Sequence, residues 1–121
     1  MIVLYLNWRV NNMNMEKVIK NLSLKEATNI SNDVDFENVY IGDLLSVVMS
    51  NAKEHSIWIT IQTHLNIVAV ADLIDIAGII VVEDMEVDKD TVEKANELEI
   101  PILTTYKSAY DVACEIYEIS S

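Results

Sequence analysis

Three short segments of the chain are continuously apolar and rich in β-branched residues, which predicts buried strands. These segments are residues 57–61, 79–82 and 100–105. Apolar runs without alternation are typical of a parallel sheet that is covered on both faces. Because side chains alternate along a strand, we expect Ile57, Ile59 and Ile61 to share one face of the sheet. Trp58 and Thr60 should then point to the other face.

The segments between these strands have the apolar spacing of helices. The expected helices are residues 43–52, 66–77, 88–98 and the segment from Ser108 onward. Asp88 or Asp90 can cap the third of them, and Ser108 with Asp111 forms a Ser-x-x-Asp cap for the last. The first should bury one face made of Leu44, Leu45, Val48, Met49 and Ala52.

Weaker patterns complete the order of elements. They predict a short helix over residues 15–21, a short strand or loop over 24–28 and a strand over 36–41. Strands and helices thus alternate from residue 36 onward. This order predicts an α/β fold, a three-layer α/β/α sandwich with a mostly parallel central sheet and right-handed crossovers.

Residues 1–14 do not follow this strand–helix rhythm, so we divide the chain into an N-terminal extension, 1–14, and a single domain, 15–121. Two interpretations of the extension stay open. Met13 and Met15 are plausible alternative starts, which would make it an upstream addition. The apolar run from Ile2 to Leu6 could instead add an edge strand, in this subunit or in a neighbouring one.

Composition excludes several classes of protein. The chain has 121 residues, 8 basic and 20 acidic, for a net charge of -12, and 51% of its residues are apolar. That apolar content is too high for a disordered acidic tail. The two glycines and one proline are too few for a turn-rich β-sandwich. The negative charge argues against nucleic acid and against anionic membranes as partners.

The residue inventory also limits location and cofactors. Cys114 is the single cysteine, and the chain has no Cys/His cluster with zinc-ligand spacing. A reducing cytoplasm is therefore the expected compartment, and we predict no cofactor and no metal. The apolar run over residues 65–82 is interrupted by Asn66, Asp72 and Asp75, which disfavours a membrane span.

Several stretches resemble the DRTGG-domain family. They are Tyr40-Ile41-Gly42-Asp43-Leu44-Leu45-Ser46, Asn51-Ala52-Lys53, Trp58 to His64, Asn66 to Ala71 and Ile100-Pro101-Ile102-Leu103. The resemblance covers roughly residues 15–119. It implies a fold similar to the N-terminal domain of HPr kinase/phosphorylase and a non-catalytic regulatory or dimerisation module. Kinase activity is not implied, because the chain lacks a Gly-x-x-x-x-Gly-Lys-Ser/Thr phosphate-binding loop.

The chain differs from the DRTGG family at the five residues after which the family is named, Asp-Arg and Thr-Gly-Gly. The Asp-Arg pair falls at Thr63-His64, and Thr-Gly-Gly falls at Val82-Glu83-Asp84. Loss of the arginine removes a bidentate anion donor. The acidic pair Glu83-Asp84 adds Cβ atoms and negative charge where two glycines would let a ligand approach the backbone.

Polar side chains follow the predicted strands at their carboxyl ends, where ligands bind in open α/β sheets. Our candidate ligand-binding residues are Asp43, Gln62, Thr63, His64 and Asn66. His64 could act as acid, base or metal ligand. Gln62, His64 and Asn66 could equally hydrogen-bond a tight turn and cap the next helix. No nucleophile accompanies them, so we assign no catalytic residue.

These observations predict a non-catalytic regulatory, ligand-sensing or dimerisation domain of the DRTGG type. The alternative is a small-molecule or phosphate-ester enzyme that uses the polar cluster around His64. Tyr106, Tyr110, Tyr117 and other apolar side chains exceed what one small core readily hides, so we expect a homodimer. A small ligand or another protein is a further possible partner.

Overall fold

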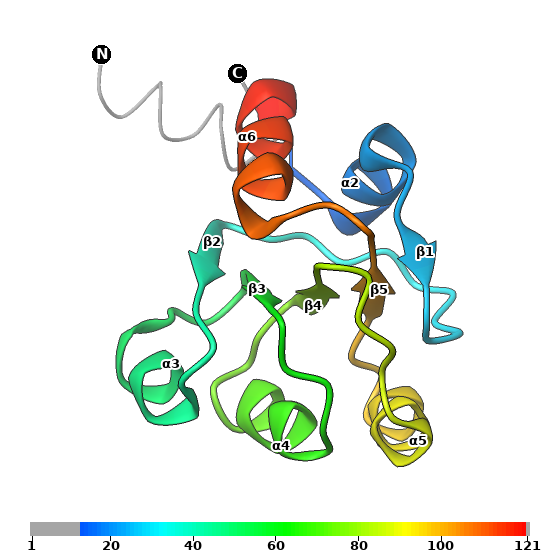
Figure 1. Ribbon diagram of the computed structural model, residues 1–121, viewed down its shortest axis with the longest axis vertical. Helices are drawn as coiled ribbons and strands as arrows, with labels where there is room; N and C mark the ends of the chain where they lie inside the picture. The colour runs from blue at the N-terminus through cyan, green and yellow to red at the C-terminus, as the bar shows by residue number, and fades with distance from the viewer. Residues whose placement is uncertain (1–12, 121) are drawn as a thin grey trace.

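The computed structural model describes residues 13–120 and shows a five-stranded sheet between two layers of helices (Figure 1). The elements are α2 (Met15–Leu22), β1 (Lys25–Glu26), β2 (Asn38–Ile41), α3 (Leu45–Asn51), β3 (Ser56–Thr60), α4 (Asn66–Leu73), β4 (Gly78–Val81), α5 (Lys89–Glu97), β5 (Ile102–Thr104) and α6 (Ala109–Ser120). The strands predicted within the described residues are present, and the predicted three-layer α/β class is confirmed.

The sheet has the strand order β1-β5-β4-β3-β2. β2, β3, β4 and β5 pair in parallel, and the two-residue β1 pairs antiparallel with β5 at one edge. The predicted mostly parallel sheet is therefore confirmed. The predicted parallel pairing of residues 57–61 with 79–82 is confirmed as well, with Trp58 beside Ile79 and Ile59 beside Ile80.

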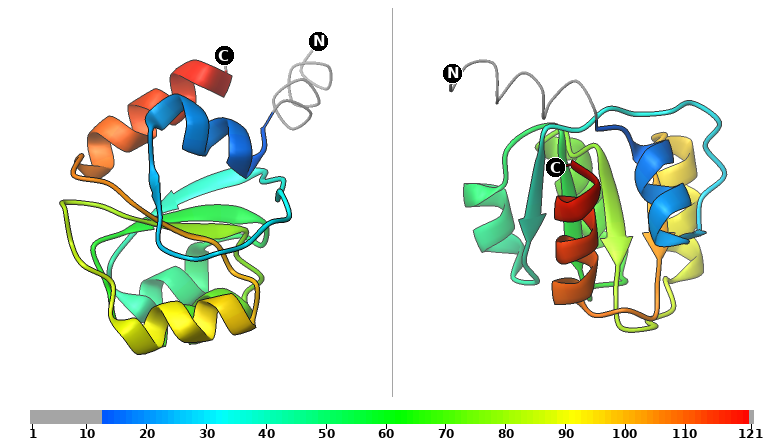
Figure 2. Two further views of the ribbon diagram at one scale, coloured as in Figure 1. Left: turned by 90° about the vertical axis from the view of Figure 1, so that its right-hand side faces the viewer. Right: turned by 90° about the horizontal axis from the view of Figure 1, so that it is seen from above.

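Two hydrophobic cores lie on the two faces of the sheet. Ile57 and Ile59 pack with Leu103 in the core beneath α2 and α6. Trp58 packs with Ile102 in the core beneath α3, α4 and α5. Figure 2 (left) shows the two helical layers on opposite sides of the strands. The predicted alternation is thus correct for Ile57, Trp58 and Ile59. Ile61, predicted to share the face of Ile57 and Ile59, lies after the end of β3 and is 39% exposed.

Two predicted helices have different bounds in the structure. α3 begins at Leu45 and not at Asp43, because the Asp43 carboxylate bonds to β3 instead of capping the helix. Within the face expected to be buried, Val48 is fully buried but Leu44 and Met49 are exposed. α4 ends at Leu73, and Asp75 in left-handed backbone (φ 57°) turns the chain into β4.

The described chain begins with residues that contact the domain. Met13 is buried against the α2–α6 core, and Asn14 caps α2 by accepting a hydrogen bond from the Lys17 N–H at 2.8 Å. The predicted edge strand at Ile2 to Leu6 lies outside the described residues. In the described part of the chain, no helix has both the length and the apolar character needed to cross a membrane.

Candidate functional site

The carboxyl ends of β2, β3, β4 and β5 meet at one edge of the sheet, because the four strands are parallel. We call this the carboxyl edge, formed by residues 42–44, 61–64, 83–87 and 104–107. All five predicted ligand-binding residues belong to this edge or to the first turn of α4. The structure brings them together in two separate groups, each with its own hydrogen bonds.

The first group is centred on Asp43 and joins the ends of β2 and β3. The Asp43 carboxylate accepts hydrogen bonds from the Thr60 hydroxyl and from the Ile61 N–H, both at 2.9 Å. The Gln62 side-chain amide donates to the Asp43 carbonyl at 2.9 Å. The buried Trp58 indole donates to the Gly42 carbonyl at 2.8 Å. Asp43 and Gln62 therefore hydrogen-bond within the protein and join the segments that follow β2 and β3.

The second group lies where β3 leads into α4. Thr63 is buried, and its carbonyl accepts a hydrogen bond from the Thr91 hydroxyl at 2.9 Å. The Asp88 N–H also donates to the Thr63 carbonyl, at 3.3 Å. Thr63 thus connects the end of β3 to the start of α5. The Thr63 carbonyl therefore stabilises the fold through hydrogen bonds to α5 and the residue before it, a role that the sequence did not predict.

His64 and Asn66 are the exposed members of the second group. His64 Nδ1 lies 2.7 Å from the Asp88 carboxylate, and 71% of the His64 side chain is exposed. This hydrogen bond, together with the charge of Asp88, raises the pKa of His64 above its ordinary value. The Asp88 carboxylate pairs with this ring instead of capping α5. Among residues 13–120, α4 likewise has no side-chain cap, so Asn66 does not cap a helix turn.

The cavity at the carboxyl edge lies over β4 and β5, not at the end of β3. It has a volume of about 640 Å³. None of the five predicted residues lines it. Its walls are Ser23, Lys25, Glu26, Ala27, Asp84, Met85, Glu86, Val87, Val92, Thr104, Thr105 and Tyr106. Sequence reasoning missed Lys25 and Glu26 because β1 joins this edge only through its antiparallel pairing with β5.

The loop after β4 forms one wall of this cavity. Glu83 and Asp84 both have left-handed backbone, with φ values of 64° and 58°. Their N–H groups donate to the Lys107 and Thr105 carbonyls, each at 2.9 Å, which joins the β4 and β5 ends. Left-handed backbone favours glycine. The two positions that match the Gly-Gly pair of the DRTGG resemblance therefore keep a glycine-like conformation although they carry acidic side chains.

A second cluster of titratable groups lies at the opposite ends of the strands. Glu54, His55 and Asp75 are the one described group close enough to share a metal ion, and all three are exposed. His55 Nδ1 lies 3.2 Å from Glu37 and Nε2 lies 3.0 Å from Asp75. The hydrogen bond that the His55 ring donates to the Glu37 carboxylate raises the pKa of His55. Both ring nitrogens of His55 contact carboxylates, so ion pairing accounts for this cluster without a metal ion.

Comparison with known proteins identifies the fold. The chain is similar to a crystal structure of the CBS and DRTGG domains of the regulatory region of Clostridium perfringens pyrophosphatase, which is complexed with its activator, diadenosine tetraphosphate. The TM-score is 0.73 and the sequence identity is 15%. The match covers 96% of this chain and 50% of that one, so the chain spans half of its structural neighbour. No protein-family model matches the chain, nor does any curated protein.

The predicted DRTGG-like character is confirmed at the level of the fold. The structural neighbour is described as part of a regulatory region. The similarity defines the class of fold to which the chain belongs, a DRTGG-like α/β domain.

Proposed function

We propose that this protein is a non-catalytic, ligand-sensing regulatory domain whose ligand binds at the carboxyl edge of the sheet. The observation that carries the proposal is the cavity of about 640 Å³ over the ends of β4 and β5. Such a cavity lies where open α/β sheets bind ligands. The fold similarity to a regulatory region that binds a nucleotide activator supports the same role.

The walls of the cavity favour a nucleotide bound together with a divalent cation. Tyr106 offers an exposed aromatic ring for stacking, and Thr104 and Thr105 offer hydroxyl groups. Lys25 offers one positive charge, whereas Asp84 and other acidic walls would repel a bare polyphosphate. Mg²⁺ commonly bridges carboxylates and phosphate oxygens, which would remove that conflict.

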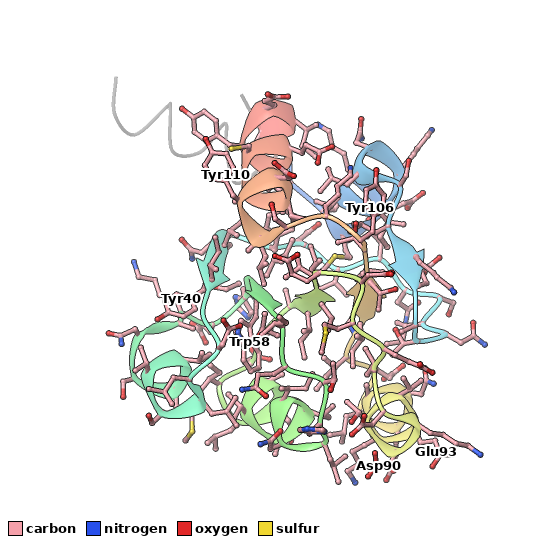
Figure 3. All side chains as sticks on the ribbon, viewed as in Figure 1. Tyr40, Trp58, Asp90, Glu93, Tyr106 and Tyr110 are labelled. Carbon is pink, nitrogen blue, oxygen red and sulfur yellow. The ribbon has the colours of Figure 1, made fainter. Side chains whose placement is uncertain are left out.

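A thermal-shift experiment tests this proposal on the full chain. Diadenosine tetraphosphate and ATP are added with and without Mg²⁺, and a binder of the native state should raise the melting temperature. Tyr106→Ala should abolish the shift. Tyr110→Ala is the matched control, because both tyrosines are 76% exposed but Tyr110 lies on α6 and does not line the cavity (Figure 3). A shift that is equal in both variants would contradict the assignment of the cavity.

The residues predicted from sequence remain a second proposed contact at the same edge. Thr63, His64 and Asn66 lie where β3 enters α4, with Asp43 at the neighbouring strand end. His64→Ala and Asn66→Ala therefore join the same screen. Loss of a ligand-dependent shift in both, with unchanged melting of the unliganded protein, would place the ligand here instead of over β5.

The alternative function, an enzyme built on His64, has one observation in its favour, the hydrogen bond to Asp88. Orientation of a histidine by a carboxylate is common in active sites. The hydrogen bond to Asp88 raises the pKa of His64, but a catalytic acid or base must also lie within hydrogen-bond reach of the group that it serves. Within residues 13–120 we find no hydrogen bond from His64 to a serine, threonine or cysteine side chain. We therefore propose that the protein is not an enzyme.

We further propose that the chain forms a homodimer in the cytoplasm. Several large apolar side chains on or beside α3 and α4 are exposed: Leu44, Val47, Met49, Leu65 and Leu73. Contiguous exposed apolar surface is a feature of subunit interfaces. A second copy is the commonest partner that buries such a surface in closed symmetry. If measurements of mass in solution show a monomer, the exposed apolar surface would instead fit a different protein partner.

A further inference from the structure

β2 forms one edge of the sheet, and an apolar groove runs beside it. The described residues place β3 on one side of β2 and no strand on the other. The groove has a volume of about 420 Å³ and lies between β2 and α6. We call it the β2 groove; its walls are Met13, Phe36, Glu37, Asn38, Val39, Ile41, Ala113, Ile116, Tyr117 and Ser120. Figure 2 (right) shows β2 beside α6, with α2 at the other end of the sheet.

The β2 groove exposes apolar side chains on an edge with unpaired backbone groups. Val39 and Ile41 are 38% and 49% exposed, and their partners Ile57 and Ile59 face the same core. Tyr117 of α6 is 60% exposed on the opposite wall. An apolar edge strand of this kind is a template for a further strand.

The N-terminal side of the chain already pairs with the segment that leads into β2. Asn14 forms an antiparallel bridge with Asp35. Next to the bridge, the Met15 N–H donates to the Val34 carbonyl at 2.8 Å and the Phe36 N–H donates to the Met13 carbonyl at 3.4 Å. Met13 is itself a wall of the β2 groove. Residue 12 is therefore joined directly to a residue of the groove, so the preceding segment needs no linker to reach it.

The sequence of residues 6–10 has the period of a half-buried strand. Its even-numbered residues are apolar, namely Leu6, Trp8 and Val10, and its odd-numbered residues Asn7 and Arg9 are polar. Residues 2–5 before it are continuously apolar. Period-two alternation places one apolar face against a core and the polar face toward water.

We propose that residues 2–12 of the same chain bind at the β2 groove, with residues 8–11 as a sixth strand antiparallel to β2. Continuation of the Asn14–Asp35 register places Val10 opposite Val39 and Trp8 opposite Ile41. Directly opposed residues in an antiparallel pair share a face of the sheet. The even-numbered side chains therefore enter the groove, and the edge of the sheet is closed.

Disulfide trapping tests the register. In a Cys114→Ala background, the pair Val10→Cys and Val39→Cys lies within the Cα separation that a disulfide needs. Arg9→Cys with Val39→Cys is the matched control, because residue 9 is adjacent but faces the other way. We expect the 10/39 pair to close within one chain at least about tenfold faster than the 9/39 pair, owing to its higher effective concentration.

The other results of trapping overturn the proposal. Cross-linked dimers without cross-linked monomers would assign the groove to residues 2–12 of a second copy. Equal rates for the two pairs, or no disulfide in either, would show that this segment does not bind in the stated register. Mass spectrometry of the oxidised, digested protein distinguishes these cases.

Trp8 fluorescence gives an independent test on the intact chain. The difference between the spectra of wild type and Trp8→Phe reports on Trp8, because the buried Trp58 contributes to both. We expect blue-shifted emission for Trp8, and a red shift when Ile41→Lys places a charge in the groove. Ile61→Lys is the control, since Ile61 is 39% exposed after the end of β3 and is not a wall of the groove. Water-like Trp8 emission in the wild type would contradict the proposal.

Discussion

At the residue scale, the structure assigns Asp43 a role in the fold. Its carboxylate is the acceptor for the Thr60 hydroxyl, which is 1% exposed, and for the Ile61 N–H. A buried hydroxyl that loses its partner bears the full cost of desolvation. Asp43 therefore stabilises the junction of β2 and β3 whether or not a ligand contacts it.

This role predicts a graded effect of two substitutions. Asp43→Ala removes the single oxygen that accepts both hydrogen bonds and should lower the free energy of unfolding by about 1–3 kcal/mol. Asp43→Asn keeps a side-chain oxygen and should lose less. Urea denaturation measures both values. An Asp43→Ala variant as stable as the wild type would show that these hydrogen bonds do not contribute to folding.

Glu83 has a left-handed backbone conformation, which is unfavourable for a residue with a Cβ atom. Its φ of 64° is a conformation that L-residues adopt at a cost of about 1–2 kcal/mol. We expect Glu83→Gly to raise the free energy of unfolding by about 0.5–1 kcal/mol, the gain being reduced by the greater freedom of glycine in the unfolded chain. Chemical denaturation provides the measurement.

Glu86→Gly is the control for charge and for unfolded-state entropy. Glu86 is exposed in the same loop, and it is not among the described residues with positive φ. Its replacement should not stabilise the protein. Equal effects at both positions would attribute the gain to loss of negative charge and not to relief of backbone strain.

At the scale of elements, His55 joins three parts of the fold. Its ring contacts Glu37, which precedes β2, and Asp75, which follows α4. The backbone N–H of His55 donates to the Asp75 carbonyl at 2.8 Å. The hydrogen bond from the ring to the Glu37 carboxylate raises the folded-state pKa of His55 above its model-peptide value of 6.5. The ion pairs thus stabilise the protein most when the ring is protonated.

The sign of the pH dependence follows from this raised pKa. The stabilisation is fully present below the unfolded-state pKa of 6.5 and is lost as pH rises through the higher folded-state pKa. Between about pH 6 and 8, melting temperature should fall more steeply for wild type than for His55→Asn. Asparagine is chosen because it tolerates the φ of 61° at this position.

His64→Asn separates the two histidines, because the pKa of His64 is raised in the same direction by Asp88. Each single variant should lose part of the pH dependence, and the double variant should lose most of it. Identical pH profiles for the wild type and both single variants would contradict a contribution from these ion pairs.

At the scale of the whole molecule, net charge and exposed apolar surface oppose each other. A charge of -12 on each chain repels a second copy, whereas the exposed side chains on α3 and α4 favour burial. Added salt screens the repulsion and leaves the apolar contribution in place. Dimerisation should therefore strengthen as salt increases.

Light scattering across a salt series tests this expectation. We expect a dimer mass at ~100 µM protein and ~0.15 M salt, with dissociation toward low salt. Val47→Lys places a charge on the exposed face of α3 and should weaken the dimer. A monomer mass under every condition would rule out the proposed homodimer.

The sequence by itself determined the layers of this protein. Residues 57–61 and 79–82 are almost continuously apolar, so as strands they have apolar side chains on both faces. Both faces are buried when the strands lie inside a sheet with helices on each side. The alternation of Ile57, Trp58 and Ile59 between the two cores follows from strand geometry alone. These features were predictable because they depend on neighbours in the chain.

Tertiary structure alone decided which polar residues are engaged and where a cavity lies. The Gln62 side chain donates a hydrogen bond to the Asp43 carbonyl, 19 residues away, and His64 bonds to Asp88, 24 residues away. The cavity over β5 depends on β1, a two-residue strand that pairs with a segment far along the chain. Such pairings carry no periodic signal in the sequence, because each depends on how the whole chain packs.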